Sequence, residues 1–154
     1  MIKYVIAVAA MGVTGAALAA NDVALKSSVF VERSVPDANG RQTIVLEEPG
    51  AVARGDRLVF VLNYRNVGAQ TRTAFTITNP LPRPVAFQGT SDSGAIVSVD
   101  GGRTWGPLAS LRVRDTDGSL RGARPEDVTH VRWTLRRTIP VGQGGRVSFR
   151  GIVR

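Results

Sequence analysis

Apolar and polar residues alternate along most of the chain with a period of two. The pattern is clearest in Arg57–Arg65, where Leu58, Phe60, Leu62 and Tyr64 fall on one face. A β-strand has this period, and β-branched and aromatic residues favour it. Apolar residues also occupy the other face of this run. We therefore expect the strand to lie centrally in a sheet, covered on both sides.

Other extended segments show the same alternation: Val23–Val35, Gln42–Glu47, Thr73–Thr78, Pro84–Gln88, Ala95–Val99, Val128–Arg136 and Arg146–Arg154. Turn-forming residues separate them, and Arg103–Trp105 is expected to return against Ala95–Val99 as a hairpin. Leu108–Val113 is weakly patterned, and Asp115–Asp127 is predicted to be a long polar loop. Asn79–Pro82 is expected to end the preceding strand, because proline cannot donate a ladder hydrogen bond.

No stretch beyond the N-terminal segment keeps the three-and-four apolar spacing of an amphipathic helix. The regular series of short strands predicts an all-β fold, an immunoglobulin-like β-sandwich of about seven or eight strands. Large residues in the alternating strands are expected to fill its core, and these are Phe60, Tyr64, Phe75, Trp105, Trp133 and Phe149.

The first residues have the composition of a secretory signal peptide. Met1–Ala20 contains one basic residue, Lys3, then an apolar run that ends in Ala17-Leu18-Ala19. A short positive region, an apolar core and an A-x-A ending are the signal for export and cleavage. We expect residues 1–19 to be removed, so that the chain contacts a membrane only before cleavage and functions in the periplasm, at the cell surface or outside the cell.

The chain contains no cysteine, which suits a bacterial envelope protein better than a disulfide-stapled secreted module. The formal net charge is +8, and the positive charge favours acidic partners such as an anionic polysaccharide. The arginines are spread along the strands instead of clustering on one element, so no nucleic-acid partner is expected. The strongest candidate for a basic face consists of Arg132, Arg136 and Arg150.

Several motifs in a fixed order resemble one known family. They are Gly55-Asp56-x-Leu58, Tyr64-x-Asn66-x-Gly68, Val131-x-Trp133-x-Leu135 and the turn Ile139-Pro140-x-Gly142 before Val147-x-Phe149. Residues 52–154 thereby resemble the conserved repeat domain of bacterial and archaeal surface proteins, also called domain of unknown function eleven. At Asn79-Pro80 and after Gly142 the sequence departs from the family pattern. The resemblance implies an immunoglobulin-like sandwich on the outside of a prokaryotic cell.

Two short motifs are better explained by turns than by chemistry. Residues 98–105 fit the pattern S-x-D-x-G-x-T-W, which resembles the Asp-box hairpins of sialidase-type propellers. Asp100 is expected to accept backbone hydrogen bonds there, with Trp105 packed beneath. Asp115 and Asp117 have the D-x-D-G opening of a calcium loop, but no flanking helices or correctly spaced closing glutamate accompany them. They are a weak calcium candidate, and no other metal or cofactor is predicted.

No constellation of residues indicates catalysis. His130 is the single histidine, no serine is marked by an orienting base, and no glycine-rich phosphate loop opens a helix. The sequence therefore predicts a protein that is not an enzyme and has no catalytic residues.

Residues 20–51 leave two alternatives open. They form the first strands of the sandwich itself, or they act as a donor strand that enters a neighbouring molecule through four apolar side chains, Val23, Leu25, Val29 and Val31. The second alternative predicts an exported structural protein that assembles with other copies into a filament or surface layer. The competing hypothesis is a binding or adhesion module for an anionic glycan or a protein partner.

Overall fold

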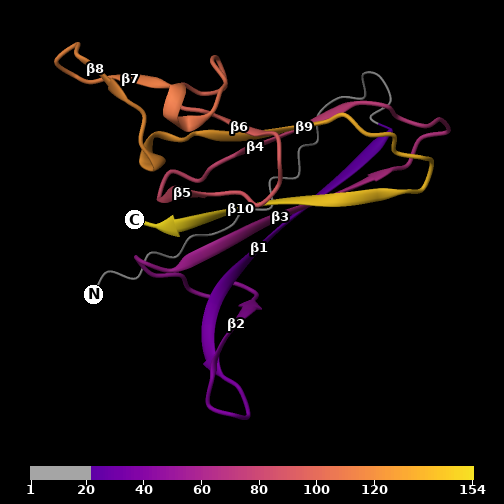
Figure 1. Ribbon diagram of the computed structural model, residues 1–154, viewed down its shortest axis with the longest axis horizontal. Helices are drawn as coiled ribbons and strands as arrows, with labels where there is room; N and C mark the ends of the chain where they lie inside the picture. The colour runs from indigo at the N-terminus through magenta and orange to yellow at the C-terminus, as the bar shows by residue number, and fades with distance from the viewer. Residues whose placement is uncertain (1–21) are drawn as a thin grey trace.

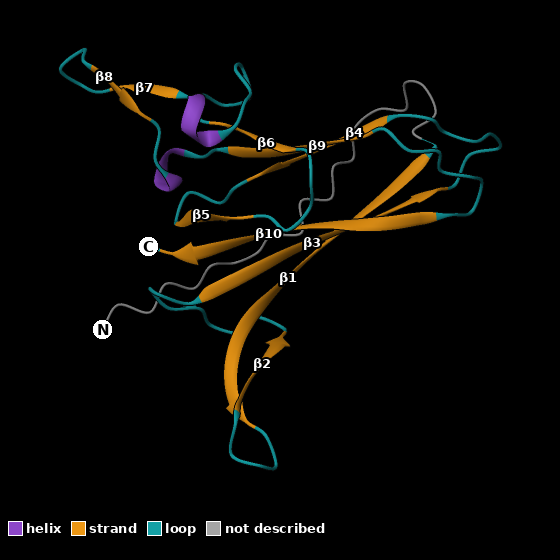
Figure 2. Ribbon diagram, in the orientation of Figure 1, coloured by secondary structure: helices purple, strands orange, loops and turns teal. Residues whose placement is uncertain are grey.

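The computed structural model describes residues 22–154, so the predicted signal peptide lies outside the described residues. This part of the chain is built almost entirely from antiparallel strands (Figures 1 and 2). The strands are β1 (Val23–Pro36), β2 (Gln42–Glu47), β3 (Arg57–Asn66), β4 (Phe75–Pro80), β5 (Val85–Gly89), β6 (Ala95–Ser98), β7 (Arg112–Arg114), β8 (Leu120–Gly122), β9 (His130–Leu135) and β10 (Gly144–Val153). Two short 3-10 helices, η1 (Leu108–Ser110) and η2 (Pro125–Asp127), complete it. The prediction of an all-β, sandwich-like fold is confirmed.

Two sheets enclose the core. One has the strand order β2-β1-β3-β10-β5, and the other has the order β4-β9-β6; β7 and β8 form a separate hairpin. The central position expected for Arg57–Arg65 is confirmed, because β3 pairs with β1 on one side and with β10 on the other. The expectation that both faces are covered is wrong, because Asn63 and Arg65 on the second face are exposed. One face of β3 carries the buried Leu58, Phe60, Leu62 and Tyr64, as the alternation predicts.

Aromatic side chains from both sheets meet in the core. Phe60 and Phe149 stack with ring centroids 4.5 Å apart, and Trp133 approaches Phe149 from the three-stranded sheet at 6.0 Å. Burial of rings of this size is a major source of stability in a sandwich. Of the other predicted anchors, Tyr64 is buried and Phe75 is half-buried against the core. Trp105 is only half-buried and lies outside the core cluster, contrary to expectation.

Asn66, at the end of β3, is a polar residue with no exposed surface. Its Nδ2 donates to the carbonyl oxygens of Gln70, at 2.8 Å, and Ile139, at 2.9 Å, and its Oδ1 accepts from the N–H of Gly68 at 3.0 Å. Buried polar groups are stable only when they are hydrogen-bonded in this way. Asn66 therefore fastens the loop after β3 to the connection between β9 and β10.

The strand β4 ends at Pro80, within the segment Asn79–Pro82 that is predicted to end it; Pro80 still pairs with His130, because β4 is an edge strand where a missing N–H is tolerated. Two local predictions are wrong. The predicted polar loop 115–127 contains β8, which pairs with β7, and η2. The segment Arg103–Trp105 does not form a ladder with β6; a single bridge between Val97 and Gly106 joins them.

Candidate interaction surfaces

Strand β1 has two different partners along its length. Its first part, Val23–Val31, pairs with β3, and its last part, Val31–Pro36, pairs with β2. Figure 1 shows the second part and β2 projecting from the sandwich as a hairpin, which we call the arm (residues 31–47). Val31 lies opposite both Leu58 and Glu47, so it marks the point where the strand leaves the sandwich for the arm.

The structure decides between the two alternatives for the N-terminal segment. Residues 23–31 pair within their own chain, so they are not a free strand offered to a neighbour. Of the four side chains predicted to enter a partner, Val31 is buried in this chain's own core, and Val23 and Val29 pack against that core. Only Leu25 is largely exposed, at 49%. The prediction of a donor strand formed by these four residues is therefore corrected.

The arm is fixed at its base by two ion pairs. Arg33 Nη1 lies 2.9 Å from Asp56 Oδ1, and Arg150 Nε lies 2.7 Å from Glu32 Oε1. The pKa of Asp56 is lowered, first by the hydrogen bond from the backbone N–H of Ala53 and then by Arg33. Since both faces of β1 are tied in this way, the arm has a defined direction relative to the sandwich.

The arm carries apolar side chains that nothing in the described part of the chain covers. Ile44 is 59% exposed and Leu46 is 51% exposed, on the same face of β2. β2 is also the outermost strand of its sheet, with β1 as its one partner among the described strands. Sequence reasoning found the strand but missed this surface, although the spacing of Ile44 and Leu46 places them on one face. The sequence alone does not show that this face of β2 is left uncovered.

The two sheets leave hollows between their edges. One, of about 370 Å³, lies between the start of β1 and β4 and is lined by Asp22, Val23, Leu25, Arg72, Ala74, Phe75 and Thr76. A second, of about 280 Å³, lies between β5 and β6 and has mostly apolar walls that include Phe87, Ala95, Ile96, Val97, Pro107 and Leu108. The second hollow lies between edge strands of the two sheets, and the first lies beside the start of β1, which β2 does not pair with.

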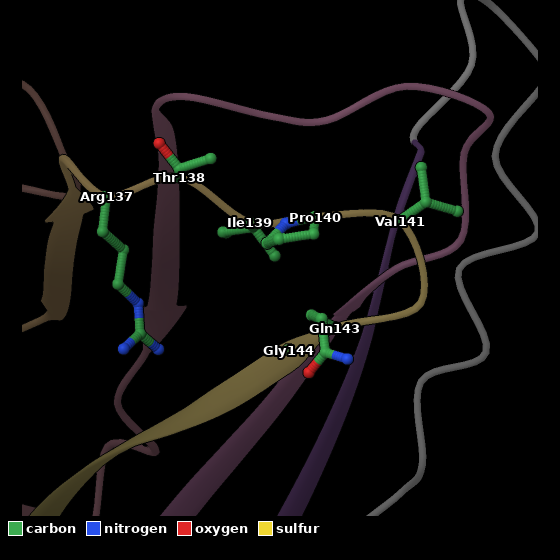
Figure 3. A pocket seen from close by; sticks show the side chains of 7 residues that line it. All are labelled: Arg137, Thr138, Ile139, Pro140, Val141, Gln143 and Gly144. Carbon is green, nitrogen blue, oxygen red and sulfur yellow. The ribbon is translucent and has the colours of Figure 1, made fainter.

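A third depression, of about 500 Å³, follows the connection between β9 and β10 (Figure 3). It is lined by residues of one continuous segment: Arg137, Thr138, Ile139, Pro140, Val141, Gln143 and Gly144. Arg137 is its one ionisable residue, and its guanidinium donates to the hydroxyl of Tyr64 and lies 5.5 Å from that ring. The depression thus brings together no acid–base pair and no nucleophile with a base.

The predicted basic face does not form. Arg132 lies on β9 between the buried Val131 and Trp133, so it points away from the core on the outside of the three-stranded sheet. Arg150 lies on β10, on the outer face of the other sheet, where Glu32 pairs with it. Arg136 follows β9 and is exposed. Since Arg132 and Arg150 belong to opposite sides of the sandwich, the three arginines cannot form one anion-binding surface.

The Asp-box pattern forms a turn, as predicted. The carboxylate of Asp100 accepts hydrogen bonds from the N–H groups of Arg103 and Thr104 and from the hydroxyls of Ser98 and Thr104, at 2.7–3.2 Å. The bonds from Thr104 and then Ser98 hold the pKa of Asp100 well below its usual range. Trp105 donates to the Gly102 carbonyl within the same turn.

One face of the Trp105 ring is already covered within the chain. The guanidinium carbon of Arg132 lies 3.6 Å from its centroid, and His130 contacts it edge-on at 6.2 Å. A cation stacked on an indole at this distance covers one face of the ring. We therefore infer that the Asp-box turn has a structural role.

Asp115 and Asp117 belong to the hairpin of β7 and β8. Asp115 pairs with Arg121 at 3.0 Å, and Asp117 accepts from the N–H and hydroxyl of Ser119. Arg121 also pairs with Asp127 at 2.6 Å, which ties η2 to the hairpin. Within residues 22–154 no group of three or more His, Asp or Glu side chains could hold a metal ion. The calcium candidate is therefore replaced by an ion-paired turn.

Comparison with protein-family models, curated proteins and solved structures finds no match to this chain. The resemblance to the conserved repeat domain accordingly stays a prediction based on its motifs. Within residues 22–154 no helix has the length and hydropathy needed to cross a bilayer. The class that the structure defines is an all-β, sandwich-like protein with open sheet edges and a projecting arm.

Proposed function

We propose that this protein is an exported, non-catalytic structural protein of a cell envelope or surface, and that its copies assemble through their open sheet edges. The observation that carries the proposal is the arm, which exposes Ile44 and Leu46 on an unpaired edge strand. Exposed edge strands are templates for pairing with a further chain, and natural proteins block those they do not use. The signal-peptide pattern of residues 1–19 supports the export part of the proposal.

The proposed route of assembly differs from the donor strand expected from the sequence. Because the N-terminal strand pairs with β3 in its own sandwich, we infer that copies would meet through the arm and not through residues 23–31. The alternative function, a binding module for an anionic glycan, required a basic face. Arg132 and Arg150 lie on different sheets, so no observation favours that alternative.

The test compares the full chain with two matched double variants. The first, Ile44→Lys with Leu46→Lys, charges the arm; the second, Leu120→Lys with Val141→Lys, charges two equally exposed apolar positions elsewhere. Each protein is produced in a host with export machinery, located by cell fractionation, and examined by light scattering and negative-stain microscopy over a range of concentrations.

We expect the wild type and the control variant to be exported and to form species larger than a monomer. The arm variant should be exported but remain monomeric, because two ammonium groups cannot be buried in an apolar contact. A wild-type protein that stays in the cytoplasm, or that is monomeric at every concentration and at the native cell surface, would refute the proposal.

A further inference from the structure

The edge of β2 lacks several of the devices that keep sheet edges apart. Strands at an edge are normally protected by lysine, proline, a bulge or a covering loop. Between Gln42 and Glu47 the sequence QTIVLE contains no lysine and no proline, and its pairing with β1 is regular from one end to the other. The free side of β2 can therefore accept another strand over its whole length.

The charges at the two ends of β2 have opposite signs. Arg41 directly precedes the strand, Glu47 is its last residue and Glu48 follows it. All three side chains are exposed, and none of them takes part in an ion pair within the described residues. Asp37 lies in the turn before Arg41, where its carboxylate accepts the backbone N–H groups of Asn39 and Arg41. An antiparallel copy of the same strand would bring each positive end next to a negative end. A parallel copy would bring like charges together, which destabilises a pair.

We propose that the occupant of this edge is β2 of a second copy of the chain, paired antiparallel about a twofold axis that passes midway between the Ile44 residues of the two copies. The five-stranded sheets of the two copies would then form one continuous sheet. In this register Arg41 lies opposite the partner's Glu47, and the same pair recurs on the other side of the axis. This inference rests on the proposed function, since it specifies how copies of the protein meet.

The register also matches the apolar face. Directly opposed residues of an antiparallel pair point to the same side of the sheet. Ile44 would therefore lie against the partner's Ile44, with Leu46 opposite the partner's Gln42 on the same side. Arg41 and Glu47 lie on the other side of β2, so both charge pairs form away from the apolar contact. A twofold interface of this kind is self-complementary, and cyclic dimers are the commonest symmetric assembly.

Cysteine cross-linking tests the contact directly, because the chain has no cysteine of its own. Opposed residues of an antiparallel pair have Cα atoms about 4.5–5.5 Å apart, within the range that a disulfide spans. The full chain with Ile44→Cys should form a disulfide dimer under mild oxidation. The control is Leu120→Cys, at a position that is 62% exposed on the separate β7–β8 hairpin; it should remain monomeric.

Charge reversal provides a second readout that does not depend on oxidation. Arg41→Glu and Glu47→Arg should each weaken dimerisation by about tenfold at low salt, because each replaces two attractions by two repulsions. The double variant should restore most of the wild-type affinity.

Two results would overturn the interface. One is cross-linking of Ile44→Cys that is no stronger than that of Leu120→Cys, and the other is a double variant that dimerises no better than the single variants. If the wild type still assembles in that case, the proposed function stands; a wild type that never assembles refutes both.

Discussion

The deletion of one buried amide offers a quantitative test of how the sandwich is held together. Asn66→Ala removes two hydrogen bonds donated to the carbonyls of Gln70 and Ile139 and one accepted from Gly68. Each such bond is worth about 1 kcal/mol net, and the buried partners lose access to water as well. We expect a loss of about 3 kcal/mol in the free energy of unfolding, a large fraction of the total for a domain of this size.

The measurement is urea unfolding of the full chain followed by Trp fluorescence. The matched control is Asn63→Ala, because Asn63 is the same residue type on the same strand but is exposed. It should change stability by no more than about 0.5 kcal/mol. A loss below about 1 kcal/mol for Asn66→Ala, or an equal loss for both variants, would refute the argument that Asn66 fastens the two loops.

A third variant separates hydrogen bonding from volume. Asn66→Asp has nearly the same shape and keeps the acceptor for Gly68, but its carboxylate would face the carbonyls of Gln70 and Ile139. Folding then raises the carboxyl pKa above its unfolded value of about 4, so the variant loses stability as pH rises from that value through the higher pKa of the folded state. Its stability relative to wild type should therefore be worse at neutral than at acid pH; a constant difference would contradict this reasoning.

Three further outcomes are expected from the contacts. Gly144→Ala should cost about 2 kcal/mol or more in urea unfolding, because a Cβ there would overlap the carbonyl oxygen of Tyr64, whereas Gly122→Ala meets open space and should be nearly neutral. Phe149→Ala should cost about 3–5 kcal/mol through loss of the core stack, measured in the same way. Folding lowers the pKa of Asp100, so its contribution is present above the unfolded value of about 4 and is lost as pH falls. Asp100→Asn should therefore flatten the decline of stability between about pH 5 and pH 2, and an unchanged decline would contradict the turn's hydrogen-bond pattern.

Most strand positions could be predicted because burial on one face enforces a period of two. That rule recovered β1, β3 and β9, whose apolar side chains face the core. It failed for β8, because the β7–β8 hairpin is held by Arg121 between Asp115 and Asp127 and not by an apolar face. An ion-paired turn carries no hydrophobic period, so alternation cannot reveal it.

The candidate surfaces were harder to predict, because alternation shows on which face of a strand a residue lies but not which sheet the strand joins. Arg132 and Arg150 occupy equivalent outward positions in their own strands, yet they lie on opposite sides of the sandwich. The same limit applies to β1, whose apolar residues looked suited to a partner molecule. Pairing with β3 uses most of them within the chain.

In the arm, the burial that the sequence pattern predicts differs from the burial in the structure. Its strand β2 has the apolar spacing of a buried strand, but Ile44 and Leu46 are largely exposed. Val31, buried between the β3 pairing and the β2 pairing, ties the arm to the core. Because two ion pairs also fix its base, little conformational entropy would be lost when a second strand adds to it. An apolar strand edge with one free side is what assembly through strand pairing requires, and the Ile44→Cys cross-link tests that conclusion at a single residue.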